Sequence, residues 1–163
     1  MVEDGLISWV GDVDSAPSCD SVVDVAGQCV IPGFGDSHAH LMFAGSREQE
    51  FAARMAGVSY SAGGIKTTVA KTRAATDSEL RANAQKLIAE FYQSGVTHFE
   101  IKSGYGLDIE TEVRSLKIAR EFTEDTTFLG AHVVPADQDS EAYVELVTTT
   151  MLDAAAPLAK WID

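Results

Sequence analysis

The feature that most constrains the fold is a regular alternation of helical and strand patterns in the second half of the chain. Apolar side chains recur at helical spacing over 77–94, and a strand pattern follows over 96–102. Thr76 and Glu79 have the spacing of a capping box at the start of this helix. The same order continues with a helix after Asp108, a strand over 126–131, a helix after Ser140 and a last strand at 161–163. Strands that alternate with helices pair as parallel neighbours, so this pattern predicts an α/β fold.

Residues 1–31 show a different pattern, in which short apolar runs are separated by Gly, Asp and Ser. Runs at 6–10, 22–25 and 30–31 have the length and the turn signals of strands in a small sheet. We therefore expect two domains: 1–31 as part of a small β domain, and 32–163 as the strand–helix domain.

Charge and composition argue against several classes of function and location. Its 163 residues carry 25 acidic and 12 basic side chains, a net charge of -13, which disfavours binding to nucleic acid and to anionic membranes. No apolar run approaches the roughly 20 residues that cross a bilayer. The N-terminus has acidic residues where a signal peptide is basic, and two cysteines are too few for a disulfide framework. These features predict a cytoplasmic protein.

The strongest local motif is His38-Ala39-His40, at the expected end of a strand. In an extended segment the side chains of residues i and i+2 point the same way, so the two imidazoles converge. Paired neutral imidazoles suit zinc or iron, and the motif predicts a metal site; a hydrogen-bonded loop pair is the alternative. Tyr105 and His132 also follow strands, at the edge where parallel sheets gather functional residues.

Five segments together resemble the imidazolonepropionase family of the amidohydrolase superfamily. They are residues 4–11, 30–41, 41–47, 100–108 and 127–135. The resemblance implies the N-terminal part of a (β/α)8 TIM-like barrel of the amidohydrolase type. It also implies that part of a small β-sandwich domain precedes this barrel.

The resemblance also implies an activity. The family hydrolyses the cyclic amide C–N bond of 4-imidazolone-5-propanoate to N-formimidoyl-L-glutamate in histidine degradation, using one zinc or iron ion. It implies that His38 and His40 are metal ligands and that four residues bind substrate: Arg47, Tyr60, Tyr105 and His132. It further implies a homodimer in the full-length form.

The residue types fit these implied roles. The Arg47 guanidinium can bind the propanoate carboxylate through two hydrogen bonds, although a surface helix position would also suit an arginine. Tyrosine combines an apolar ring with a polar tip, and a packed ring is the alternative for Tyr60. His132 can hydrogen-bond the substrate, or it can be a further metal ligand or a strand-end histidine.

In the family, the second half of the barrel supplies the third metal histidine and the acid/base groups. We therefore expect no catalytic residue within 1–163, and we expect this chain alone to be inactive. Two alternatives remain: another cyclic amidohydrolase or deaminase, and a non-catalytic fragment. The acidic face of 108–124 is expected to be solvated.

Overall fold

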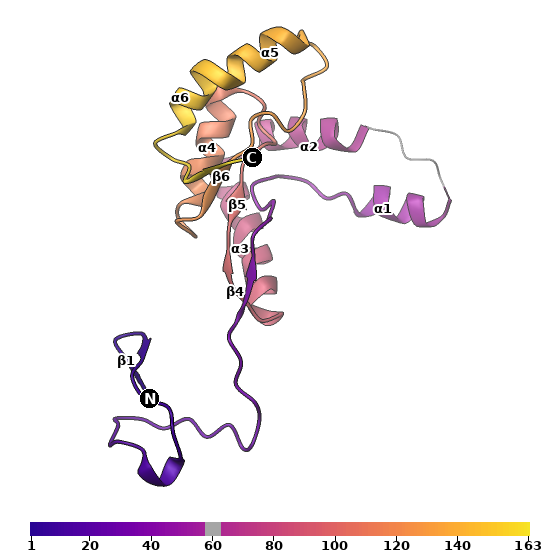
Figure 1. Cartoon of the computed structure of the whole chain (residues 1–163). Coiled ribbons are helices and arrows are strands. Elements are labelled where there is room, and N and C mark those ends of the chain that lie inside the picture. The colour runs from indigo at the N-terminus through magenta and orange to yellow at the C-terminus, as the bar shows by residue number, and fades with distance from the viewer. Residues whose placement is uncertain (58–62) are drawn as a thin grey trace. The chain divides into compact units, whose positions relative to one another are not determined.

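The computed structural model describes residues 1–57 and 63–163, and these residues divide into two units, Met1–Pro32 and Gly33–Asp163 (Figure 1). In the first unit, β1 (Val2–Glu3) and β2 (Leu6–Ile7) form an antiparallel hairpin. Asp4 and Gly5 connect the two strands with φ angles of 51° and 78°. A type I′ turn requires positive φ at both central residues, and its twist matches that of paired strands.

The rest of the first unit contains one short 3-10 turn, η1 (Val13–Ser15), and extended chain. The runs at 22–25 and 30–31 form no strands within this unit, so that part of the sequence prediction is wrong for the chain as it stands. A β-strand needs a neighbouring strand that bonds its N–H and C=O groups, and no strand of this unit pairs with these runs. The carbonyl of Val25 accepts only the N–H of Gln28, in a turn. The small β-sandwich stays a prediction.

The second unit contains parallel strands in the expected order. β3 (Phe34–Asp36) pairs with β4 (Val96–Phe99), while β6 (Thr126–Phe128) pairs with both β5 (Ile101–Lys102) and β7 (Trp161–Ile162). The segment predicted as one strand over 96–102 is interrupted at Glu100, whose N–H donates to the Asp36 carbonyl at 3.0 Å. The predicted α/β class is confirmed, and the complete barrel stays a prediction.

Helices connect these strands, as the sequence pattern predicts. They are α1 (Glu48–Met55), α2 (Gly63–Ala74), α3 (Asp77–Gln93), α4 (Ile109–Ala119), α5 (Ser140–Leu146) and α6 (Leu152–Ala155). Figure 1 shows α5 and α6 as one continuous helix, and α6 contacts α4.

A π-helical turn, η2 (Val147–Met151), joins α5 to α6, where the sequence predicts an unbroken helix. The hydroxyls of Thr148 and Thr149 donate to the carbonyls of Val144 and Glu145, at 2.8 and 2.6 Å respectively. Side chains that compete for helical carbonyls locally disturb the regular ladder, which accounts for the irregular turn at this threonine run.

The ends of α3 follow from local chemistry. Thr76 caps the helix: its hydroxyl accepts the Glu79 N–H, and the Glu79 carboxylate accepts the Thr76 N–H at 2.8 Å. The Thr76 N–H and the Thr76 hydroxyl both donate to the Glu79 carboxylate, and these two bonds lower the pKa of Glu79 below its ordinary value. At the other end, Gly95 follows the C-cap Ser94 with a φ of 86°, the left-handed conformation that commonly terminates a helix. The capping box predicted from the sequence is therefore confirmed.

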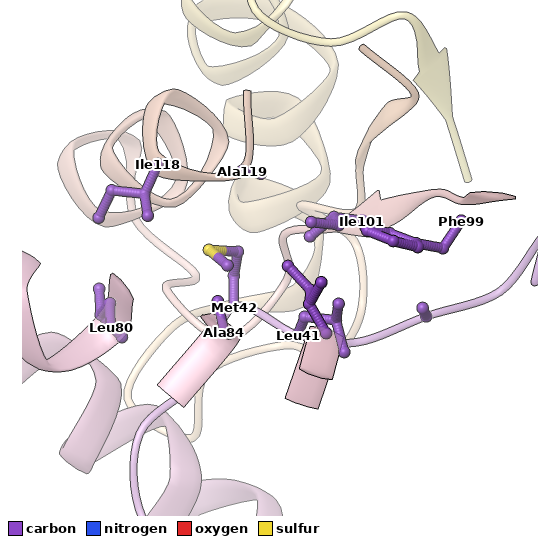
Figure 2. Packing of buried hydrophobic residues seen from close by; sticks show 10 residues of the cluster. Leu41, Met42, Leu80, Ala84, Phe99, Ile101, Ile118 and Ala119 are labelled. Carbon is purple, nitrogen blue, oxygen red and sulfur yellow. The ribbon is translucent and has the colours of Figure 1, made fainter. Parts of the chain in front are cut away.

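One hydrophobic cluster joins α3, the strand edge and the segment after the histidine pair (Figure 2). Figure 2 labels Leu41, Met42, Leu80, Ala84, Phe99, Ile101, Ile118 and Ala119. Each fully buried leucine, isoleucine or methionine in such a cluster contributes about 1.5–3 kcal/mol. Leu41 and Met42 immediately follow His40, so this cluster anchors the chain at the candidate site.

A second cluster packs α2, α4 and β6 against α5 and α6. Its buried members are Val69, Leu107, Leu116, Phe128, Tyr143, Val147, Met151 and Ala155. The Tyr143 hydroxyl donates to the Gly130 carbonyl at 2.6 Å, two residues before His132, and burial raises the pKa of Tyr143 to about 12. The described part of the chain contains no helix with the length and apolar character of a membrane span.

We predict that Thr76→Ala lowers the free energy of unfolding by about 1 kcal/mol, because the first turn of α3 loses its cap. Urea denaturation followed by circular dichroism measures this change. Thr76→Ser keeps the hydroxyl and should retain most of the stability, and Ser78→Ala, at an exposed position in the first turn of α3, is the matched control. Equal losses for Thr76→Ala and Ser78→Ala would contradict the prediction.

Candidate functional site

His38 and His40 lie on one face of the extended segment that follows β3. Their Nε2 atoms are 3.3 Å apart, as the i, i+2 spacing predicts. Ala39 and Leu41 alternate with them and are buried in the core, whereas His38 is exposed and His40 is half-buried. Alternation therefore directs both imidazoles away from the core and toward each other.

The backbone between the two histidines is bonded to the strand over 96–102. The Ala39 N–H donates to Glu100 Oε1 at 2.8 Å, and the Ala39 carbonyl accepts the Lys102 N–H at 2.9 Å. The N–H of His38 donates to Asp36 Oδ1 at 3.0 Å. These bonds fix the direction of both histidine side chains.

Glu100 belongs to a buried polar network. Its Oε1 lies 3.3 Å from Lys102 Nζ, its Oε2 accepts the Thr127 hydroxyl, and its side chain is only 8% exposed. Lys102 Nζ also lies 2.8 Å from Asp163 Oδ2. Burial lowers the pKa of Lys102, but the bonds to Asp163 and Glu100 outweigh it and hold this pKa above its ordinary value. Lys102 is therefore engaged in ion pairs.

Tyr105 and His132 join the histidine pair. The ring of His40 lies 5.6 Å from that of Tyr105 and 5.3 Å from that of His132, measured between centroids, and Tyr105 and His132 are 5.3 Å apart. The ring of Phe43 borders Tyr105 at 6.0 Å. Three loops after neighbouring strands thus bring His38, His40, Tyr105 and His132 to one place.

The electrostatics of this cluster favour neutral rings. Burial, together with His132, His38 and Lys102, lowers the pKa of His40, and Glu100 opposes this shift. Burial also lowers the pKa of His132 below its ordinary value. Neutral imidazole is the form that coordinates a metal or accepts a hydrogen bond. Burial raises the pKa of Tyr105, so its phenol stays protonated and can donate.

Arg47 lies at the start of α1, and its guanidinium pairs with Glu50 at 2.5 Å. A Cβ on Gly64 would come within 2.3 Å of Arg47 Nη2, so the absence of a side chain at this position lets the guanidinium pack against α2. The charge of Arg47 acts on Tyr105, whose pKa it lowers against the effect of burial. Tyr60, the remaining predicted substrate residue, lies outside the described residues.

An open cavity of about 620 Å³ borders His38. Its lining includes His38, Glu100, Lys102, Thr127, Trp161 and Asp163. The cavity therefore presents an imidazole, an ammonium and carboxylates to solvent.

The histidine pair fits a single metal ion. Two nitrogens that each lie about 2.05 Å from a tetrahedral zinc are about 3.4 Å apart, which agrees with the observed 3.3 Å. Within 1–57 and 63–163, no group of three or more His, Cys, Asp or Glu side chains is placed to hold a metal. The described residues thus offer two ligands, and the roles of all predicted site residues stay predictions.

Sequence reasoning missed two buried carboxylates. Glu100 lies between β4 and β5. Glu112 on α4 is fully buried, so the prediction that the acidic face over 108–124 is solvated is wrong at this position. Glu112 lies four residues before Leu116 and seven before Ala119, on the apolar face of the helix. That spacing was the available signal. His98 lies outside the cluster, where its Nε2 is 3.1 Å from Asp125 Oδ2.

Comparison with curated proteins identifies close relatives. Imidazolonepropionases from Mycolicibacterium smegmatis, Salinispora tropica and Streptomyces avermitilis are 57%, 58% and 54% identical to the chain. Each similarity covers the whole chain, which spans 42%, 42% and 40% of the length of these relatives. No protein-family model matches the chain.

We predict that Glu100→Ala destabilises the chain by about 2–4 kcal/mol, because the Ala39 N–H and the Thr127 hydroxyl lose their acceptor and Lys102 loses a partner. Urea denaturation measures the change, with Glu124→Ala as the control because Glu124 is acidic and exposed. Equal losses of unfolding free energy in both variants would show that the Glu100 network does not stabilise the chain.

Proposed function

Because the chain belongs to the imidazolonepropionase family and matches the N-terminal portion of its relatives, we propose that it forms the first part of an enzyme of histidine degradation. That enzyme opens the cyclic amide C–N bond of 4-imidazolone-5-propanoate and releases N-formimidoyl-L-glutamate. The convergence of His38, His40, Tyr105 and His132 in one cluster carries this proposal.

His38 and His40 would hold one zinc or iron ion through their Nε2 atoms, since their separation suits two nitrogens on one metal. When bound, such an ion supplies Lewis acidity, which polarises a carbonyl and lowers the pKa of water. The bonds from Ala39 to Glu100 and Lys102 keep both imidazoles in place before any metal arrives.

The remaining residues would bind the substrate. The protonated Tyr105 hydroxyl donates a hydrogen bond, and the neutral His132 ring donates or accepts one at the imidazolone. Arg47 holds the propanoate carboxylate, which requires its guanidinium to exchange Glu50 for the substrate. Tyr60 completes the proposed substrate contacts. The full-length enzyme is proposed to be a cytoplasmic homodimer.

Among the described residues, His38 and His40 form the proposed ligand pair, and no group of three or more His, Cys, Asp or Glu side chains is placed to hold a metal. Catalytic zinc takes three protein ligands, and hydrolysis requires proton transfer. We therefore propose that the chain is inactive unless further residues complete the site.

A chimeric protein tests the function. Residues 1–163 replace the matching portion of the Mycolicibacterium smegmatis relative, and the product is assayed with 4-imidazolone-5-propanoate, a hydantoin, dihydroorotate and guanine. We expect turnover of the imidazolone alone. Absence of turnover would contradict the proposal, and preference for another substrate would favour a different cyclic amidohydrolase or deaminase.

We predict that His38→Ala and His40→Ala each abolish stoichiometric metal in this chimera, because each removes one of the two nitrogens. Elemental analysis of the purified protein measures metal per chain. His98→Ala, at an exposed histidine paired with Asp125, is the control and should keep its metal. Full metal content in His38→Ala or His40→Ala would rule the pair out as ligands.

We predict that Arg47→Lys raises the KM of the chimera for the imidazolone about 10- to 100-fold with a smaller effect on kcat. A lysine keeps the charge but loses the two-bond contact with the carboxylate. Arg54→Lys, on the same helix and also exposed, should leave KM unchanged. An unchanged KM in Arg47→Lys would show that the Arg47 guanidinium does not bind the substrate carboxylate.

A further inference from the structure

One buried carboxylate holds the loop between β5 and α4. Glu112 Oε1 accepts the N–H groups of Gly106 and Leu107, each at 2.8 Å, and its Oε2 accepts the N–H of Gly104 at 2.9 Å. The Glu112 side chain has no solvent exposure. Three backbone amides within four residues therefore converge on a single side chain, which we call the Glu112 clamp.

The loop is shaped to receive this carboxylate. Gly104 has a φ of 112°, which a residue with a side chain rarely adopts. A Cβ on Gly106 would lie 2.8 Å from the Glu112 backbone nitrogen and 2.9 Å from its Oε1. Gly106 thus permits the close approach of Glu112, and Gly104 permits the backbone conformation of the loop.

Arg73 on α2 holds the same loop from another side. Its Nε donates to the Gly106 carbonyl at 2.6 Å and lies 2.9 Å from Asp108 Oδ2. Gly106 therefore has both of its backbone polar groups bonded to side chains of different helices. Such bonds leave this part of the loop little freedom to move.

All three amide partners of the carboxylate donate, so the acceptor-only ionised form fits the loop. Burial raises the pKa of Glu112, and the Ser103 hydroxyl and the N–H groups of Leu107, Gly106 and Gly104 oppose the rise. A glutamine would replace one acceptor oxygen by an NH2 group that faces N–H donors. The clamp is therefore specific for a carboxylate.

Tyr105 is the residue that the clamp encloses, between the bonded amides of Gly104 and Gly106. Its ring faces His40 at 5.6 Å and His132 at 5.3 Å. Because the backbone on both sides is fixed, the direction of the Tyr105 side chain is fixed as well.

We propose that Glu112 is a positioning residue, which fixes residues 104–107 and thereby orients Tyr105 toward the histidine cluster for substrate binding. This proposal rests on the proposed function, because that function gives Tyr105 its contact with the substrate. Glu112 itself faces the loop backbone and acts through Tyr105.

The first test needs no activity. In the 163-residue chain, amide hydrogen exchange is followed by NMR for Glu112→Gln and for Glu110→Gln, a control at an exposed position on the same helix. We expect exchange at Gly104, Gly106 and Leu107 to accelerate about tenfold or more in Glu112→Gln only. Unchanged protection would overturn the clamp, as would equal acceleration throughout the core.

A milder variant guards against misfolding. Arg73→Gln removes the hydrogen bond to the Gly106 carbonyl and the ion pair with Asp108 from a side chain that is 38% exposed, so the fold should persist. We expect faster exchange at Leu107 and Gly106, smaller than in Glu112→Gln. Unchanged exchange in this variant would show that α2 does not hold the loop and would count against the proposal.

The second test asks whether Glu112 acts through Tyr105. In the chimeric enzyme we expect Glu112→Gln to raise KM about tenfold with kcat nearly unchanged, and to add less than about twofold once Tyr105→Ala is present. If Glu112→Gln raised KM by the same factor with Tyr105 and with Tyr105→Ala, Glu112 would have a general structural role, and the proposal would be overturned. Inactivity of the unsubstituted chimera would instead refute the proposed function, whereas the exchange experiment alone decides the clamp.

Discussion

The candidate site depends on how one small residue, Ala39, is bonded to the neighbouring strand. Its N–H and its carbonyl both bond to the segment 100–102, and its methyl group lies in the hydrophobic core. Extended backbone held in this way must direct the side chains on either side to the opposite face. The position of both imidazoles thus follows from the pairing of parallel strands and from core packing.

Buried carboxylates recur as the groups that fix loops after strands. Glu100 bonds to the loop that carries the histidine pair, and Glu112 bonds to the loop that carries Tyr105. A chain with a net charge of -13 uses some of its acids inside the fold, where backbone N–H groups satisfy them. These bonds give the loop backbone fixed partners within the fold.

Much of this arrangement follows from sequence periodicity. The strand–helix order, the capping box at Thr76 and the convergence of His38 and His40 depend on local spacing, and the structure confirms them. The interruption at Glu100 and the burial of Glu112 depend on partners distant in the sequence, which spacing cannot reveal. The prediction of strands at 22–25 and 30–31 is wrong for the same reason, because a strand exists only with a bonded neighbour.

The burial of Ala39, Leu41 and Met42 has a thermodynamic consequence for the histidine pair. Residues on both sides of His40 belong to the cluster that includes Leu80 and Ile101, so the segment can detach only when that cluster opens. Local fluctuation is therefore coupled to cooperative unfolding at this point. An ion that bound the pair would spend little free energy on ordering its ligands, and it would stabilise the whole domain through mass action.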